Sequence, residues 1–321
     1  MTAGVFNLGY LIAAICFILA FKLMSSPRTA ARGNTISAFG MLLAIVITLL
    51  QAETLNPATV VGGMLLGTAI GAWFAKTTPM TGMPQMVALL NGFGGGASLL
   101  VAGGTLHSGS TTQLQSLIAT ALSGLIGAVT FWGSLVAYGK LEEWKFLEGL
   151  RFKSHQAIVF TFLVLAVLAM IPVVVTPPGE MWFWIACAIA SVLGILLVVA
   201  IGGADMPVVI CLLNSYSGLA AAATGFVLNN SMLIIAGSLV GASGLILTQI
   251  MCKAMNRSMA NVILGTMDTS TAAKADDVYG GKVKSASADE LAMLLADAQT
   301  VVIVPGYGLA VSQGQHALKD L

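Results

Sequence analysis

Residues 206–228 read MPVVICLLNSYSGLAAAATGFVL, a stretch without a charged side chain in which the only asparagine is Asn214. About 20 apolar residues form a helix long enough to cross the ~30 Å hydrocarbon core of a bilayer. The proline falls in the first turn, where its missing N–H costs nothing. Asn214 then lies about eight residues, or ~12 Å, inside the helix. The stretch therefore predicts a transmembrane helix with an amide near the membrane midplane.

A second stretch repeats this pattern. Residues 83–97 (MPQMVALLNGFGGGA) align without gaps with residues 206–220, and Asn91 falls where Asn214 lies. Met, Pro, both Leu, Asn, Gly and Ala are identical, and further along the chain residues 125–128 (LIGA) resemble residues 239–242 (LVGA). These matches indicate an internal repeat of membrane helices with parallel orientation. Chance similarity between apolar helices is the alternative.

The composition extends the membrane assignment to most of the chain. Of the 321 residues, 57% are hydrophobic and 8% are charged, whereas a soluble domain carries roughly 25% charged residues. We therefore expect an α-helical polytopic membrane bundle of about nine transmembrane helices in a lipid bilayer. The predicted spans are residues 4–24, 35–52, 57–75, 83–103, 114–138, 156–175, 181–201, 207–228 and 231–251. The net charge of +1 gives no reason to expect a nucleic-acid partner.

The distribution of lysine and arginine predicts the orientation. All 14 lie at or after spans one, three, five and nine or in the C-terminal tail, and the loops after spans two, four, six and eight hold none. Basic loops remain on the cytoplasmic side. We therefore expect the N-terminus outside and the C-terminus in the cytoplasm. In the basic loop after span five, residues 140–155 (KLEEWKFLEGLRFKSH) predict a short interfacial helix, with partner docking as the alternative.

Three polar residues in or beside the spans are candidates for function. Asn91 and Asn214 either hold helices together, which is worth about 0.6–2 kcal/mol, or line a polar path. An amide does not titrate near neutral pH, so neither side chain can carry a proton. Asp205 precedes Met-Pro in the turn Gly-Gly-Ala-Asp, where it is expected to cap the following helix or to act as a gate.

The character of the chain changes after residue 258, and we predict three domains. Residues 1–258 form the transmembrane domain, residues 259–286 a polar linker, and residues 287–321 the N-terminal fragment of a Rossmann-like α/β domain. Ser287 and Glu290 have capping-box spacing at the start of a helix. Residues 300–304 (TVVIV) predict a buried strand, followed by a glycine turn and a second helix. About 35 residues are too few for a whole domain of this class, so a longer protein is expected.

The turn after this strand fits a phosphate-binding motif. Gly306 permits a tight turn, and Gly308 allows the backbone to approach a pyrophosphate at the start of a helix. The third position of the GxGxxG pattern is Val311, so the motif is incomplete. An ordinary β-turn-α connection is the alternative to dinucleotide binding.

Taken together, these residues resemble the β subunit of proton-translocating nicotinamide nucleotide transhydrogenase over nearly the whole chain. The most specific stretches are residues 201–209 (IGGADMPVV), 213–218 (LNSYSG), 251–258 (MCKAMNRS) and 305–311 (PGYGLAV). The resemblance implies an enzyme that transfers hydride from NADH to NADP⁺ while a proton moves inward. It also implies a partner α subunit that carries the NAD(H) domain, a dimer of α–β units, and a multi-pass position in the bacterial inner membrane.

The resemblance also implies roles for particular residues. The proton path and its coupling fall on Asn91, Asn214, Ser215, Asp205, Lys253 and Arg257. The NADP(H) site includes Gly306, Tyr307, Gly308, Leu309, Ala310 and Val311. No catalytic residue for hydride transfer is expected in this chain. No metal site is expected either, because the four cysteines lack ligand spacing.

Position 91 departs from the family pattern, since some members have a proton-carrying histidine where this chain has Asn91. His107, His155 and His316 all lie outside the predicted spans. We therefore expect the titrating group to come from a helix of the α subunit. A secondary transporter or channel with a parallel repeat is the alternative function, and a structural membrane scaffold is the third.

Overall fold

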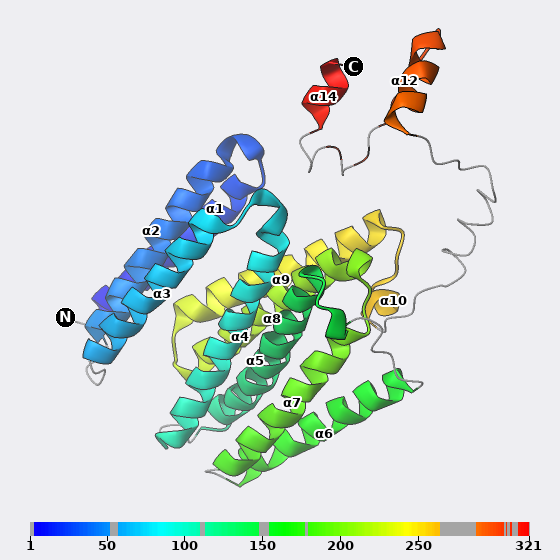
Figure 1. Cartoon of the computed structure of the whole chain (residues 1–321). Coiled ribbons are helices and arrows are strands. Elements are labelled where there is room, and N and C mark those ends of the chain that lie inside the picture. The colour runs from blue at the N-terminus through cyan, green and yellow to red at the C-terminus, as the bar shows by residue number, and fades with distance from the viewer. Residues whose placement is uncertain are drawn as a thin grey trace. The chain divides into compact units, whose positions relative to one another are not determined.

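The structure, a computed structural model, describes residues 3–51, 57–109, 113–147, 154–176, 179–263, 287–304, 306, 309 and 314–320. Contacts divide the chain into two units (Figure 1). The first comprises Met1–Thr78 and Gly82–Gly265, and the second comprises Pro79–Thr81 and Thr266–Leu321. The domain boundary predicted at residue 258 stays a prediction.

Within the described residues, nine helices are long and apolar enough to cross a membrane, which confirms the predicted number of spans. They are α1 (Ala3–Met24), α2 (Pro27–Gln51), α3 (Pro57–Thr77), α4 (Met83–His107), α5 (Leu114–Leu141), α6 (His155–Val175), α7 (Glu180–Val199), α8 (Met206–Val227) and α9 (Ser231–Ala254). The largest difference is at α2, which begins at Pro27 rather than at residue 35. Apolar runs reveal only the part of a helix inside hydrocarbon, so they miss polar turns that extend beyond it.

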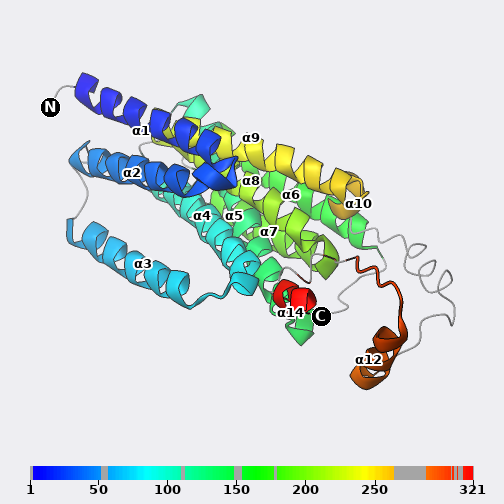
Figure 2. The ribbon, with the colours of Figure 1, turned by 90° about the horizontal axis from the view of Figure 1, so that it is seen from above.

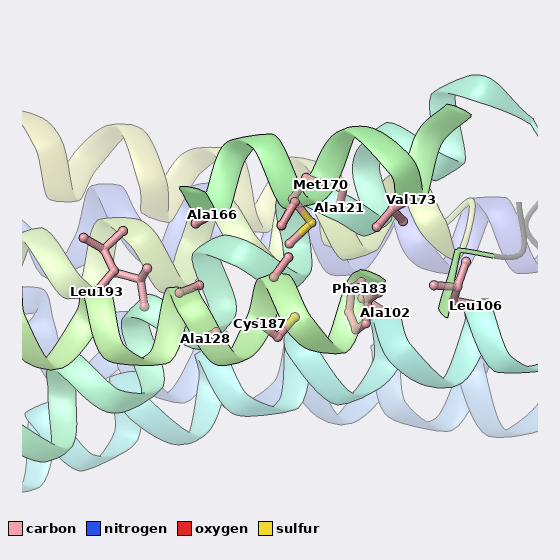
Figure 3. Close-up of a cluster of buried hydrophobic side chains, with 14 of the residues drawn as sticks. Ala102, Leu106, Ala121, Ala128, Ala166, Met170, Val173, Phe183, Cys187 and Leu193 are labelled. Atoms are coloured by element: carbon pink, nitrogen blue, oxygen red, sulfur yellow. The ribbon is translucent and has the colours of Figure 1, made fainter. Parts of the chain in front are cut away.

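Helices α5 and α8 form the centre of the bundle. Over their most apolar 18-residue windows, 56% of α5 and 61% of α8 is buried. Helices α4, α7 and α8 pack against α5, and α9 packs against α8. A cluster of buried apolar side chains, including Phe183 and Leu193 of α7 and Met170 of α6, holds α6 and α7 against α5 (Figure 3).

Helices α1, α2 and α3 lie outside this centre. α1 packs along α2 and touches α9, where Tyr10 and Met232 share a small cluster. No residue in the apolar window of α3 is buried, and Figure 2 shows this helix apart from the other membrane helices. Among the nine helices, α3 therefore leaves the largest share of its apolar window exposed.

The structure supports the internal repeat. A short 3₁₀ turn precedes each half: η1 (Met80–Gly82) before α4, and η3 (Gly203–Asp205) before α8. A Cβ atom on Gly94 of α4 would lie 3.8 Å from the Cβ of its repeat equivalent, Ser217 of α8. Equivalent residues thus face each other at equal depth, and the two helices run in parallel.

Glycines set the spacing of the helices in both halves. A Cβ atom on Gly127 of α5 would lie 2.6 Å from the Gly95 carbonyl oxygen of α4. A Cβ atom on Gly218 of α8 would lie 2.6 Å from the Gly241 nitrogen of α9. Gly95 and Gly218 are equivalent in the repeat, as are Gly127 and Gly241. The same backbone-to-backbone crossing therefore occurs twice, as membrane helices allow where small residues meet.

Helices α5 and α9 also end alike. The residues after them include Glu143 and Asn256, with φ of 54° and 53°. The next N–H groups, of Trp144 and Arg257, each donate to a carbonyl five residues earlier, at 2.9 and 2.8 Å. This arrangement is a Schellman motif, which satisfies carbonyls that the helix leaves free. The motif fixes the direction in which the chain leaves α5 and α9.

The loop after α5 tests the predicted short interfacial helix only in part. At its start, α5 continues to Leu141 and the 3₁₀ turn η2 (Lys145–Leu147) follows the Schellman motif. Residues 148–153 lie outside the described residues. After α9, the short helix α10 (Met259–Ile263) buries Val262 against the bundle.

The C-terminal unit confirms one local prediction and not another. Helix α12 (Ala288–Asp297) begins with a capping box between Ser287 and Glu290. No strand occurs in the described residues, and 301–304 are exposed without strand pairing. A strand needs neighbouring strands to bond its backbone, so the Rossmann-like fold remains a prediction. Helix α14 (Gln315–Asp320) follows.

The glycine crossing predicts a difference between two equally small changes. Gly218→Ala should lower the melting temperature of the purified protein, because the new Cβ would meet the Gly241 nitrogen at 2.6 Å and overpacking costs about 1–3 kcal/mol. Gly62→Ala is the matched control, since no atom lies within 4 Å of that site in α3. It should leave the melting temperature unchanged or raise it slightly. Equal melting curves for both variants would show that the crossing tolerates a methyl group.

Candidate functional site

Charged and polar residues gather where α5, α7 and α9 end and α8 begins, which we call the basic end of the bundle. Its buried feature is an ion pair between Asp205 and Arg257. Arg257 donates from Nη2 to Asp205 Oδ2 at 2.8 Å and from Nε to Oδ1 at 3.4 Å. The Asp205 side chain is 6% exposed and the Arg257 side chain 24%. The pair joins two predicted coupling residues that are 52 positions apart in the sequence.

The local backbone explains this pairing. The Schellman motif after α9 directs Arg257 back toward the bundle, with its N–H on the Cys252 carbonyl at 2.8 Å. Asp205 occupies the N-cap position of α8, but its side chain makes no capping hydrogen bond. The prediction that Asp205 caps this helix is therefore wrong. Its φ and ψ of −92° and −2° are not those of a capping residue, and its carboxylate instead binds the guanidinium.

Asn91 joins the two halves of the repeat. Its side chain is buried, and Nδ2 donates to the Ile210 carbonyl of α8 at 3.2 Å. In a regular helix the N–H of Asn214 donates to the same carbonyl. Asn91 and the backbone of Asn214 therefore share one acceptor. Both lie at the same distance into their helices, eight residues after Met83 and Met206.

Asn214 differs from its repeat equivalent. It is half-buried, and its side chain has no hydrogen-bond partner among the described residues. The neighbouring Ser215 is fully buried and donates to the Gly241 carbonyl of α9 at 2.6 Å. Ser215 therefore holds α8 to α9, while the Asn214 amide remains available on the other side of the helix.

Lys253 does not join the ion pair. Its side chain is exposed, one turn before Arg257. Both residues line an open hollow of about 430 Å³ at the basic end, together with Gln249, Asn256 and Ser258.

Among the polar contacts of the described residues that the sequence did not reveal, three link different helices near functional candidates or at the ends of the bundle. Ser123 of α5 bonds the Thr224 hydroxyl of α8 at 2.8 Å, and both are buried. At the end opposite the basic end, His107 Nδ1 lies 3.0 Å from Glu180 Oε1 on an exposed surface. At the basic end, Lys140 bonds backbone carbonyls at the end of α7. Lys140, His107 and Glu180 each had a helix-end signal, since basic side chains favour helix C-termini and acidic ones favour N-termini, but the contacts they make had none.

A cavity of about 620 Å³ opens between the N-terminal helices and the repeat helices. One wall carries large apolar side chains such as Phe17 and Met41, and the other carries small residues that include Gly94 and Ser217. Ser217 lies three residues after Asn214, on the same face of α8. Asn214 does not itself line the cavity, but it lies within one helical turn of this wall.

Most of the proposed dinucleotide turn falls outside the described residues, namely Tyr307, Gly308, Ala310 and Val311. Gly306 is exposed, and no atom lies within 4 Å of where its Cβ would be. The N–H of Leu309 donates to the Gly306 carbonyl at 3.1 Å and closes the turn. Among the described residues, no group of three or more His, Cys, Asp or Glu could hold a metal ion.

Comparison with known proteins gives a consistent result. The family model described as NAD(P) transhydrogenase beta subunit matches residues 6–321. A protein named NAD(P) transhydrogenase subunit beta from Rhodospirillum rubrum is 41% identical to this chain over 331 aligned positions. The alignment covers 100% of this chain and 71% of the relative. A second sequence of that name, from a specified strain of the same species, matches to the same extent.

The buried ion pair predicts a coupled effect on stability. Arg257→Gln should destabilise the purified protein, because it leaves the Asp205 carboxylate buried without its partner. Breaking a fully buried pair costs about 3–5 kcal/mol, and the 24% exposure of the arginine side chain makes us expect the lower part of that range. The double variant with Asp205→Asn should be more stable than Arg257→Gln alone. Thermal unfolding measures both, with exposed Lys253→Gln as control. Simple additivity in this mutant cycle would contradict the pairing.

Proposed function

This chain belongs to the NAD(P) transhydrogenase beta subunit family, and from that membership we propose that its bundle carries the proton path of the enzyme. The enzyme transfers hydride between NAD(H) and NADP(H) and couples that transfer to proton translocation. The bond from Asn91 to the Ile210 carbonyl is the observation that carries the proposal, because it joins the α4 amide to α8 one turn before Asn214, at the depth where the sequence predicts the midplane. No feature of the described residues favours the alternative of a secondary transporter or channel.

The two amides have different tasks in this proposal. Asn91 is buried and engaged by α8, so it holds α4 and α8 in register. Asn214 is half-buried with its side chain available, so it binds water or a titrating side chain. A polar group in hydrocarbon must find such a partner, because leaving it unbonded costs several kcal/mol. Because neither amide titrates, each orients a proton carrier and does not act as one.

We propose that the carrier comes from a membrane helix of the α subunit. The cavity beside α8 has a wall of small residues, including Gly94 and Ser217, and small residues let another helix approach closely. A helix lying against that wall would present its side chains to Asn214, one turn away. This arrangement supplies the titrating group that position 91 lacks in this chain. A dimer of α–β units is part of the same proposal.

Coupling to the soluble part is assigned to the basic end. Arg257 follows α9 and binds Asp205, which immediately precedes α8. A displacement of the chain after α9 therefore acts on the start of the helix that carries Asn214. Lys253 adds a second positive charge beside the ion pair. We place this end in the cytoplasm of a bacterial cell, on the basis of its lysines and arginines.

We assign the NADP(H) site to residues 306–311. The described part fits this assignment, because the open space around Gly306 leaves room for a phosphate group. The N–H groups of the turn and of the following helix would bind the pyrophosphate. NADP(H), when bound, accepts or donates the hydride. The NAD(H) site is assigned to the α subunit.

The proposed orientation is tested by labelling from each side of the membrane. In whole cells, a membrane-impermeant maleimide should label His107→Cys and should not label Lys145→Cys, because these residues lie at opposite ends of the bundle. Opening the cells should expose position 145. The parent protein, with its four native cysteines, provides the background. Labelling of position 145 in intact cells would reverse the orientation.

The amides are tested with the α–β enzyme in sealed vesicles. Asn214→Leu should lower proton-coupled hydride transfer by roughly five- to 150-fold, since losing the bond that this amide is proposed to make with water or the proton carrier is worth about 1–3 kcal/mol. NADP(H) binding should persist. Asn91→His should retain more activity than Asn91→Leu, because an imidazole N–H can still donate to the Ile210 carbonyl.

The control for these variants is Asn7→Leu, an exposed amide in α1, which should leave pumping unchanged. Wild-type pumping by Asn214→Leu would move the path elsewhere. Equal loss in Asn91→His and Asn91→Leu would show that the amide only packs helices.

A further inference from the structure

Lys140 joins the end of α5 to the end of α7. Its ammonium group donates to the carbonyl oxygens of Val199 and Ile201. Val199 is the last residue of α7, and Ile201 lies in the turn that leads to Asp205. We propose that Lys140 is a positioning residue that fixes this turn, so that movement of Arg257 is transmitted to α8. The coupling part of this inference rests on the proposed function.

The chemistry of the contact suits this task. The last carbonyls of a helix have no intrahelical donor, and a positive charge at a helix C-terminus is favourable. An ammonium group has three donors, so one lysine can serve both carbonyls. Val199 and Ile201 are each 5% exposed, which leaves little access for water as a substitute donor. Since Ile201 lies beyond the helix, Lys140 restrains the turn as well as α7.

Lys140 is itself held by a rigid support. It lies in the last turn of α5, where the Schellman motif folds Trp144 back over Gly139. A Cβ atom on Gly139 would lie 2.5 Å from the Trp144 ring and 2.8 Å from Leu147. Trp144 also packs edge-on against Tyr138, with ring centroids 5.8 Å apart. The lysine therefore projects from a well-packed helix end.

The turn is fixed from two sides. At the start of the turn, Lys140 donates to the carbonyl of Ile201. At its end, four residues after Ile201, the carboxylate of Asp205 binds Arg257. Between them, Gly203 is exposed and no atom lies within 4 Å of where its Cβ would be. With Lys140 in place, the guanidinium can shift Asp205 only by moving the start of α8. Without Lys140, the turn can yield and the displacement is lost.

A comparison of the two Schellman motifs strengthens this assignment. Lys140 and Lys253 each lie three residues before the residue with positive φ that ends the motif, Glu143 and Asn256. Lys253 is exposed, whereas Lys140 turns toward the helix that leads into the second repeat. The same position of the two Schellman motifs thus serves different purposes, and Lys140 is the one that contacts the turn.

The first test measures the turn without depending on proton transport. In the α–β enzyme, Ile201→Cys, at a position that is 5% exposed, is labelled with a water-soluble maleimide, and the unsubstituted parent gives the background. Adding Lys140→Met should raise the labelling rate about tenfold, the shift expected for losing hydrogen bonds to a charged donor. Lys140→Arg should keep the parent rate. Lys145→Met, an exposed lysine in the same segment, is the matched control and should also keep it.

The second test measures coupling in sealed vesicles as protons moved per hydride transferred. Lys140→Met should lower this ratio severalfold while hydride transfer continues, and Lys140→Arg should restore the ratio. If Lys140→Met does not assemble, Lys140→Gln, which fills similar space without the charge, replaces it with the same expected results. An unchanged labelling rate overturns the proposal, as does an unchanged ratio. Because labelling requires no proton path, failure of the path assigned to Asn214 is distinguishable from failure of Lys140.

Discussion

The close approach of helix backbones at paired glycines is the constraint on which this bundle depends. In lipid there is no hydrophobic force between helices, so their association relies on packing and on a few polar contacts. Gly95 against Gly127 and Gly218 against Gly241 bring two helix pairs into backbone contact. That proximity lets a short side chain such as Ser215 reach the backbone of the neighbouring helix. The spacing of the glycines therefore decides which polar groups can meet inside the membrane.

Much of the fold could be predicted from the sequence because bilayer thickness dictates the length of each span. The nine helices follow from apolar runs, and the repeat follows from two short matching stretches. The capping box at Ser287 is a local signal and was also predictable. The exposed chain at residues 301–304 was not, because a strand depends on partners that an apolar run does not specify. Helix ends were inexact for a similar reason, since polar end turns carry no hydrophobic signal.

The candidate site was predictable as a set of residues and not as a set of contacts. Asp205 and Arg257 could be selected separately, but their pairing depends on how α9 ends and on the direction in which the chain leaves it. Asp205 looked like a helix cap, and its pairing with the Arg257 guanidinium explains why it is not one. Asn91 likewise could be placed at the midplane, whereas its acceptor on α8 is a backbone atom with no sequence signal. Contacts of this kind require the packed structure.

The two halves of the repeat have diverged from structural equivalence into different roles. Gly82 ends the turn before α4, where Asp205 ends the turn before α8, so only the second half carries a charge at the start of its helix. Asn91 is buried and bound, whereas Asn214 is half-buried with a free side chain. Trp144 packs onto its own helix end, whereas Arg257 at the matching position reaches Asp205. At each pair the first half braces the bundle and the second half presents a polar group. The glycine crossing that both halves share keeps their backbones in the same geometry while the side chains change. One copy of a duplicated helix pair can therefore stabilise the bundle while the other carries the functional polar groups.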